Sequence, residues 1–436
     1  MNVDRKVRLT VICPLDPFSN ETGGAETWVR GFIKYAPDDF EVEFIGFTTD
    51  AKQRPPRRWN KGKLGGRELS FFPLFLRTQE NRKPRIPMSL CFTVALQLSR
   101  MQFPERALFF NRIEPAIIFR KQDNPKIAIV HNDILKQHTP GLSEVLWSKC
   151  PWAYFMLEKL ILKSVDSVYT VSNNTLSFYR TRYDGLKTKF AFIPTSADPE
   201  LFYPGPGYKR PLKGELCAEC GAMTRWNTWV LFVGRLQEQK NPRKVIDTFA
   251  EYLKKNREAG LIIIGDGSLR SSVEEHVKEL SIGEHVVLLG NVKQDTLARF
   301  YRASDVLLLT SNFEGMPICV LEGLACGTPV VTTDVGEVKK VVIPRYSGEI
   351  AGSPSPSAIA GALERVLSDP KLYSQSNCVK AASEYRPQRV MQPLYDAIRE
   401  LATERYGTPG APKPCPLSPS EVARAKPHSE SGNSDI

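Results

Sequence analysis

Residues 306–333 read VLLLTSNFEGMPICVLEGLACGTPVVTT, and this stretch decides the fold class. Its first residues form a short, continuous apolar run, which is typical of a strand buried on both faces of a sheet. After a loop, Pro317 opens a helix-like segment that runs to Ala325, and a second strand-like run covers Pro329–Thr333. Strand, helix and strand in this order predict one βαβ unit of a parallel sheet.

The same alternation of strands and helices continues on both sides of this unit. The other strands expected in the second half are Val230–Val233, Leu261–Ile264 and Val286–Leu289, and those in the first half are Val7–Cys13, Val42–Phe47, Ala107–Asn111, Ile127–His131 and Ser167–Ser172. Helical patterns lie between them, for instance at Ala25–Tyr35 and Glu144–Lys163. The sequence therefore predicts an α/β protein with two doubly wound, Rossmann-like domains in tandem.

Changes of composition along the chain suggest where these domains begin and end. We expect the first domain at residues 1–203, a linker rich in Pro, Gly and Lys at 204–228, and the second domain at 229–386. A terminal helix is expected at 387–406. The tail at 407–436 is rich in Pro, Gly and Ser and is predicted to be disordered.

The composition excludes several classes of protein. Hydrophobic residues make up 42% and charged residues 25%, as in globular proteins, and no apolar run reaches the roughly 18–20 residues that span a bilayer. The nine cysteines are scattered, and the N-terminus has no signal-peptide pattern, so a cytoplasmic protein is expected. Cys217 and Cys220 form a CxxC pair without a second pair, so no metal site is expected.

The net charge of +11 is concentrated between Lys52 and Arg85, where Lys and Arg outnumber Glu by eleven to two. This basic stretch surrounds the apolar run Phe71–Leu76. One interpretation is a surface for an anionic membrane or a lipid-linked diphosphate. The other is a strand with solvated flanks. No nucleic-acid recognition motif is present, so nucleic acid is not expected as a partner.

Ligands of open α/β sheets bind beyond the carboxyl ends of the strands, and the second half carries polar residues there. Arg235 and Lys240 follow the strand Val230–Val233, and such cations suit a diphosphate. Glu314 precedes the helix that Pro317 opens, and Glu322 lies within it. The free N–H groups at the start of that helix form an anion site, whereas the two carboxylates suit sugar or ribose hydroxyls. Surface loop charges are the alternative interpretation for each.

Two features of the first half point to the same cleft. Gly23 and Gly24 open a helix after the first strand, where a glycine pair lets the backbone approach a phosphate closely. His131 ends the strand Ile127–His131. The alternative for the glycine pair is an ordinary turn. The alternative for His131 is a histidine whose role is only structural.

Taken together, these features resemble the family-4 retaining glycosyltransferases of the GT-B fold, the glycosyl transferases of group 1. The resemblance covers about Val7 to Tyr406. The motifs that carry it are Phe232-Val233-Gly234-Arg235, Lys240-Asn241-Pro242, Ile264-Gly265-Asp266-Gly267, Leu289-Gly290-Asn291-Val292, Ser304-Asp305-Val306, and Glu314 and Glu322 followed by Gly327-Thr328-Pro329-Val330-Val331. The run Phe192–Asp198 resembles the interdomain junction of the family, although Thr195-Ser196 replaces a common Asn-Gly pair. Asn241 also stands where Gly is frequent.

The resemblance implies a role for each matching residue. Arg235 and Lys240 would bind the diphosphate of a nucleotide sugar, and the loop at Gly315 with the N–H groups of Met316, Ile318 and Cys319 would hold phosphate or sugar. The other implied contacts are Glu314 with sugar hydroxyls, Glu322 with the ribose, Asn291 and Val292 with the base, Gly23 and Gly24 with the phosphate, and His131 with the donor sugar. The last helix would cross back onto the first domain.

The expected activity is transfer of a hexose-type sugar from a UDP- or GDP-sugar to an acceptor hydroxyl with retention, in cell-surface polysaccharide or glycolipid biosynthesis. The nucleotide sugar is a co-substrate, and neither a cofactor nor a metal is required, because the cations and the helix N-terminus supply the positive charge. The expected partners are this donor and a glycan or lipid-linked acceptor. The alternatives are a sugar-nucleotide 2-epimerase of the same architecture and a non-catalytic nucleotide-sugar-binding subunit.

Overall fold

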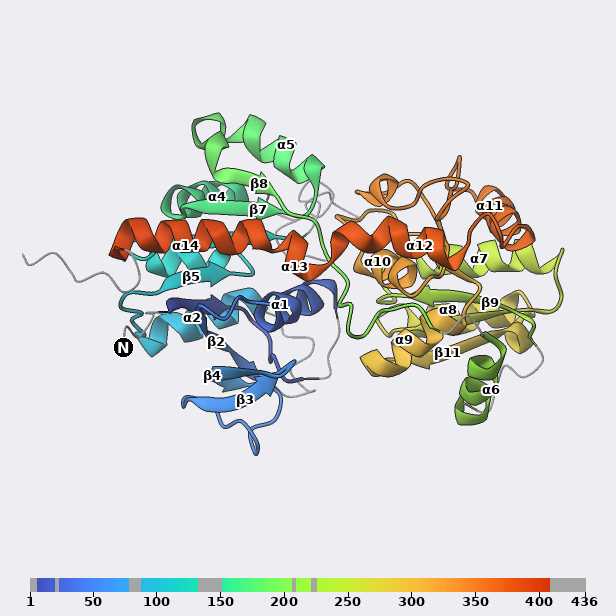
Figure 1. The fold of residues 1–436 in the computed structure, drawn as a ribbon, viewed down its shortest axis with the longest axis horizontal. Helices are drawn as coiled ribbons and strands as arrows, with labels where there is room; N and C mark the ends of the chain where they lie inside the picture. The colour runs from blue at the N-terminus through green and yellow to red at the C-terminus, as the bar shows by residue number, and fades with distance from the viewer. Residues whose placement is uncertain are drawn as a thin grey trace, which may run out of the picture.

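The computed structural model describes residues 6–19, 23–77, 88–131, 151–205, 209–220 and 226–407. Two sheets form the centres of two lobes that lie side by side (Figure 1). The first has the strand order β3-β4-β2-β1-β5-β6-β7-β8, and the second has the order β11-β10-β9-β12-β13-β14. All pairs are parallel except β3 with β4. The predicted class, two doubly wound α/β domains, is confirmed.

In the first sheet, both faces of the central strands are buried, which explains their continuous apolar sequences. The strands are β1 (Val7–Ile12), β2 (Phe40–Thr48), β3 (Asn60–Leu64), β4 (Arg67–Leu76), β5 (Ala107–Phe110), β6 (Lys126–Val130), β7 (Ser167–Thr170) and β8 (Phe190–Phe192). Helices α1 (Gly24–Lys34) and α14 (Gln392–Tyr406) pack on one face. The other face carries α2 (Met88–Ser99), the 3₁₀ helix η2 (Glu114–Phe119), α4 (Pro151–Ser164) and α5 (Asn173–Arg182).

The second sheet is covered in the same way. Its strands are β9 (Thr228–Val233), β10 (Ala259–Ile264), β11 (Val286–Gly290), β12 (Val306–Leu309), β13 (Val330–Thr332) and β14 (Gly348–Ile350). Helices α7 (Pro242–Leu253), α8 (Arg270–Glu279) and α11 (Pro356–Ser368) lie on one face. The other face carries α6 (Lys209–Cys220), α9 (Gln294–Ala303), α10 (Ile318–Ala325) and α12 (Gln375–Ala382).

The chain returns to the first domain at its C-terminal end, as predicted for the GT-B fold. After α12, the short helix α13 (Pro387–Val390) leads into α14, which lies along the first lobe (Figure 1). The Tyr395 hydroxyl donates a hydrogen bond to the carbonyl of Phe32, and Arg399 pairs with Asp39 at 2.9 Å. This helix is part of the core of the first domain.

The segment between the sheets differs from the expected linker. Within 204–228, helix α6 packs on α9 and buries Leu216 in the core of the second domain. Lys213 pairs there with Asp305 at 2.6 Å. Its short apolar face is too weak in sequence to predict a helix, and its neighbours decide its structure. The expected tail from 408 onward, residues 206–208 and 221–225, and the helix start at 144–150 lie outside the described residues.

The basic stretch forms the edge of the first sheet. The run Phe71–Leu76 is part of β4, and Phe71 and Leu74 are buried, so the expected aromatic-rich surface is largely core. Arg54 pairs with the buried Asp16 at 3.2 Å. Exposed cations remain at Lys52, Arg57, Arg58, Lys61 and Lys63, and the last two protect the edge strand β3 from pairing with other chains. Residues 78–85 of the stretch lie outside the described residues.

None of the described helices combines the length and apolar character required to cross a bilayer.

Candidate active site

Two helix N-termini, one from each domain, meet between the sheets. Helix α1 begins at Gly24 and α10 begins at Ile318, and Figure 1 shows the two helices on facing sides of the domain boundary. A methyl group added to Gly24 would lie 3.8 Å from Cδ1 of Ile318. Neither Gly23 nor Pro317 caps its helix with a side chain. The N-terminus of α10 therefore has no side-chain cap and can receive an anion that lies between the domains, whereas the Glu26 carboxylate lies against Gly23 at the start of α1.

Lys240 and Glu314 form an ion pair beside the start of α10. The distance from Lys240 Nζ to Glu314 Oε1 is 2.6 Å, and Ser311 Oγ donates to the same oxygen at 2.7 Å. Burial alone would lower the pKa of Lys240, but the Glu314 carboxylate outweighs it and the pKa is raised. Among the described residues, the one hydrogen-bond partner of Glu314 Oε2 is Gln239 Nε2, at 3.5 Å. This oxygen is the one with capacity for a ligand hydroxyl.

Arg235 lies near Lys240 but is exposed at the end of β9. Its positive charge lowers the pKa of Lys240, against the larger effect of Glu314. Within the described ranges, the Arg235 guanidinium makes no hydrogen bond or ion pair. Its five donors are therefore available to an anionic ligand.

Glu322 faces the interior rather than solvent. Tyr301 donates a hydrogen bond to Glu322 Oε2 at 2.8 Å, and burial raises the pKa of Glu322 to about 7, against the effects of this bond and of Lys240. Sequence reasoning missed Tyr301. The sequence around Tyr301 contains no pattern that would indicate a hydrogen bond to Glu322 in α10.

His131 follows β6, and its imidazole is held by Asn111 and Trp28. Nε2 lies within hydrogen-bond distance of Asn111 Oδ1, and the edge of the ring packs against Trp28. Asn111 Nδ2 donates to Cys13 Sγ at 3.2 Å, so with this amide orientation His131 Nε2 carries the proton. Burial, then the charge of Arg112, lowers the pKa of His131 to about 3. The ring is neutral at neutral pH. Asn111 was not predicted.

Gly315 brings the loop before α10 against the first domain. A methyl group on Gly315 would lie 2.9 Å from Val171 Cγ2 and 3.0 Å from the His131 carbonyl oxygen. Only glycine fits this approach without displacing a neighbour. The structure therefore brings Gly315, His131, Glu314 and Lys240 into one region, as the sequence predicted.

Glu337 ties this loop to the first domain and was not predicted. Its backbone N–H donates to Gly315 O at 2.9 Å. Its carboxylate accepts from Asn173, at 2.7 Å from the backbone and 2.9 Å from the side chain, and pairs with Lys340 at 2.9 Å. Burial would raise the pKa of Glu337, but these bonds hold it below its usual range. A second interdomain bond runs from Thr195 Oγ1 to Met316 O at 3.0 Å.

The loops after β9, β10 and β11 end at the same edge of the second sheet. Gly265, with φ of +129°, lies so close to Gly234 that a methyl group there would be 2.1 Å from the Gly234 carbonyl oxygen. The Gly265 N–H donates to Gly290 O at 2.8 Å. Asn291 follows and is exposed, whereas Val292 packs on the core. Both lie on the loop at this edge, where the predicted contact with a base would occur.

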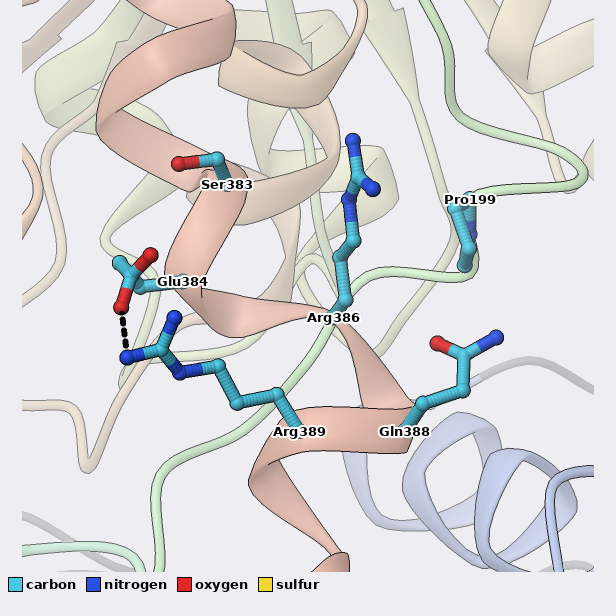
Figure 2. Close-up of a pocket in the computed structure, with 6 residues that line it drawn as sticks. All are labelled: Pro199, Ser383, Glu384, Arg386, Gln388 and Arg389. Carbon is cyan, nitrogen blue, oxygen red and sulfur yellow. Dashed lines mark ion pairs between the residues drawn. The ribbon is translucent and has the colours of Figure 1, made fainter.

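A cavity of about 490 Å³ lies elsewhere, where the chain crosses between the domains. Figure 2 shows its lining residues, which are Pro199, Ser383, Glu384, Arg386, Gln388 and Arg389. The charges of Glu384 and Arg389 compensate each other in a 2.5 Å ion pair. None of the predicted site residues lines this cavity.

Among the described residues, no cluster of His, Cys, Asp or Glu is arranged to hold a metal ion, and the expected independence from metal stays a prediction.

The second domain matches a known protein family. The profile of the family described as glycosyl transferases group 1 matches residues 227–384. A D-inositol 3-phosphate glycosyltransferase of Acidothermus cellulolyticus is 27% identical over 252 residues, which are 55% of this chain and 54% of that protein. The chain thus spans about half the length of this curated relative.

Solved structures with the same fold cover nearly the whole chain. Sucrose-phosphate synthase of Thermosynechococcus elongatus superimposes with a TM-score of 0.72 at 20% identity, over 92% of this chain and 100% of that one. The Anabaena protein HepE, solved with UDP and glucose, gives 0.67 at 15% identity, over 89% and 98%. These likenesses identify the two-domain GT-B fold.

Proposed function

We propose that this chain, which belongs to the group 1 glycosyl transferases through residues 227–384, transfers a hexose-type sugar from a nucleoside diphosphate to an acceptor hydroxyl. One observation carries the proposal: the uncapped N-terminus of α10 lies against Gly24 of α1, beside the exposed Arg235 and the Lys240–Glu314 pair. The helix end and cations suit a diphosphate. The free oxygen of Glu314 suits a sugar hydroxyl.

Departure of the diphosphate is the step that this arrangement assists. As the bond between the anomeric carbon and the phosphate oxygen breaks, negative charge grows on the phosphate, and Arg235, Lys240 and the N–H groups of α10 stabilise it. Attack of the acceptor oxygen on the same face gives retention, and the departing phosphate oxygen takes the acceptor proton. In this scheme the neutral His131 is a hydrogen-bonding group and not an acid.

The proposed donor is a UDP- or GDP-sugar, since UDP and glucose accompany the Anabaena protein of the same fold. A thermal-shift panel of UDP, GDP and ADP with their sugars tests this. A ligand at a hundred times its Kd stabilises a folded protein by about 2.7 kcal/mol, so the true nucleotide raises Tm by several degrees. Equal Tm values across the panel, in protein with a cooperative unfolding transition, would argue against a nucleotide site.

The proposed acceptor is a glycan or lipid-linked hydroxyl compound at the cytoplasmic face of a membrane, with the exposed cations of the basic stretch 52–85 beside it. The 2-epimerase and the non-catalytic binding subunit are not favoured, because the matching group 1 profile and the relative in Acidothermus are both described as glycosyltransferases.

Glu337→Gln tests the tie between the donor loop and the first domain. The neutral amide loses the ion pair with Lys340 and accepts a weaker hydrogen bond from the Asn173 backbone N–H. The Gly315 loop is therefore held less firmly against the first domain. We expect kcat/KM for the donor to fall about threefold to tenfold, on the order of 1 kcal/mol, in steady-state assays. Asp334→Asn removes a nearby exposed acid that pairs with Lys339 and serves as the control. Equal kinetics in the two variants would show that the tie is not used.

A further inference from the structure

The outer faces of two helices in the first domain carry rows of exposed apolar side chains. The row on α2 consists of Leu90, Val94 and Leu98, which are 43%, 50% and 75% exposed, and the row on α4 consists of Trp152, Met156 and Leu160, at 68%, 69% and 48%. A spacing of four residues places each row on one side of its helix. Exposed large apolar side chains are usually scattered singly, so two such rows mark an interaction surface.

The two rows belong to one layer of the molecule. Helices α2 and α4 both contact η2, and all three cover the same face of the first sheet. The inner faces of the two helices are already buried there, through Phe92 and Leu96 on α2 and Ile161 on α4. The outer rows are therefore a second apolar face on each helix. The core does not require that face, and it faces outward from the sheet.

The exposed charged side chains of α4 are positive. Helix α2 has no charged side chain in its twelve residues. On α4, Lys159 and Lys163 are exposed beside the apolar row. The one acidic residue of α4, Glu158, is turned inward and buried, where the hydroxyls of Tyr179 and Tyr183 donate to it at 2.6 and 2.7 Å. The outer face of α4 thus combines apolar and cationic groups without an exposed anion.

We propose that the outer faces of α2 and α4 dock this protein on an anionic lipid bilayer. The apolar rows enter the boundary between headgroups and acyl chains, as the apolar faces of interfacial helices do. Trp152 suits the headgroup level, and the stems of Lys159 and Lys163 lie along the bilayer while their ammonium groups reach lipid phosphates. This surface goes beyond the nucleotide-sugar site and differs from the cationic sheet edge at β3.

Co-sedimentation of the full chain with vesicles tests the docking surface. The probes are vesicles of phosphatidylcholine alone and of phosphatidylcholine mixed with phosphatidylglycerol. For Val94→Gln with Leu98→Gln, and for Trp152→Gln with Met156→Gln, we expect about tenfold weaker partition onto mixed vesicles, because each pair removes apolar area from the contact. Lys159→Gln with Lys163→Gln is expected to weaken partition onto mixed vesicles only.

A charge-matched control distinguishes the helix surface from the cationic sheet edge. Lys61→Gln with Lys63→Gln removes the same charge from the edge strand, and we expect a smaller loss of partition than for Lys159→Gln with Lys163→Gln. Loss of partition in this variant alone would overturn the proposal in favour of the sheet edge. Wild-type partition of the two apolar variants would overturn it outright.

Sedimentation velocity and thermal unfolding complete the test. A wild-type dimer that the glutamine substitutions convert to a monomer would assign the rows to a second copy of the chain. A fall of several degrees in Tm would show that the chain itself covers them. Either result would overturn the proposal. Unchanged Tm, unchanged mass and unchanged nucleotide binding together with lost partition would support it, independently of the catalytic assignment.

Discussion

Arg235→Ala combined with Lys240→Ala is expected to lower kcat/KM for sugar transfer by about a hundredfold to a thousandfold, roughly 3–4 kcal/mol of transition-state stabilisation. Both cations lie beside the open end of α10, where charge grows on the departing diphosphate. Their effect is larger in the transition state than in the bound donor, so kcat falls along with kcat/KM. Steady-state kinetics with the donor found by the thermal-shift panel measure the change.

The single variants separate function from folding. Lys240→Ala leaves the mostly buried Glu314 without its cation, which destabilises the protein itself. Arg235 is exposed and makes no ion pair among the described residues, so Arg235→Ala is expected to keep the wild-type Tm while it lowers kcat/KM at least tenfold. Lys254→Ala with Arg257→Ala is the matched control, since it removes two charges near the opposite end of β10. Activity of the Arg235/Lys240 double variant within about tenfold of wild type would remove the diphosphate role.

The elements that sequence predicted well are those in which local pattern and tertiary structure agree. The central strands are apolar on both faces because helices cover both sides, so short runs such as Leu261–Ile264 identify them. The site loops could be predicted as well, because parallel strands end at one edge, and Arg235, Lys240 and Glu314 each lie in a loop that follows such an end. Their meeting with Gly24 and His131 depends on the packing of two domains. Only the resemblance to a known family implied that packing.

Residues that were missed act through contacts between distant segments. Glu337 and Asn173 are 164 residues apart, and neither lies in a motif. Asn111 and Tyr301 lie in a strand end and a helix that are explained by packing alone, and only the fold shows the imidazole and the carboxylate beside them. In the basic stretch, the sequence suggested a cation available to a ligand where the structure has an internal ion pair. Arg54 pairs with Asp16, a buried acid far away in the sequence.

Gly315→Ala is the prediction that most directly tests whether the two domains must meet closely at the site. The methyl group would contact Val171 Cγ2 and the His131 carbonyl oxygen at 2.9 and 3.0 Å, and a backbone carbonyl cannot rotate away as a flexible side chain can. The loop that carries Glu314 must therefore move from the first domain by a few tenths of an ångström. Since small misplacements of reacting groups are costly, we expect kcat/KM to fall by about tenfold to a hundredfold.

The stability of the same variant should change much less than its activity, since overpacking costs roughly 1–3 kcal/mol and the domains can separate slightly to relieve it. Gly352→Ala is the control, because a methyl group there meets no atom within 4 Å. Val171→Ala in the Gly315→Ala background removes one of the two close contacts and is expected to restore part of the activity. Wild-type kcat/KM in Gly315→Ala would mean that the donor loop works away from His131, and the close approach of the two domains would then have no part in the reaction.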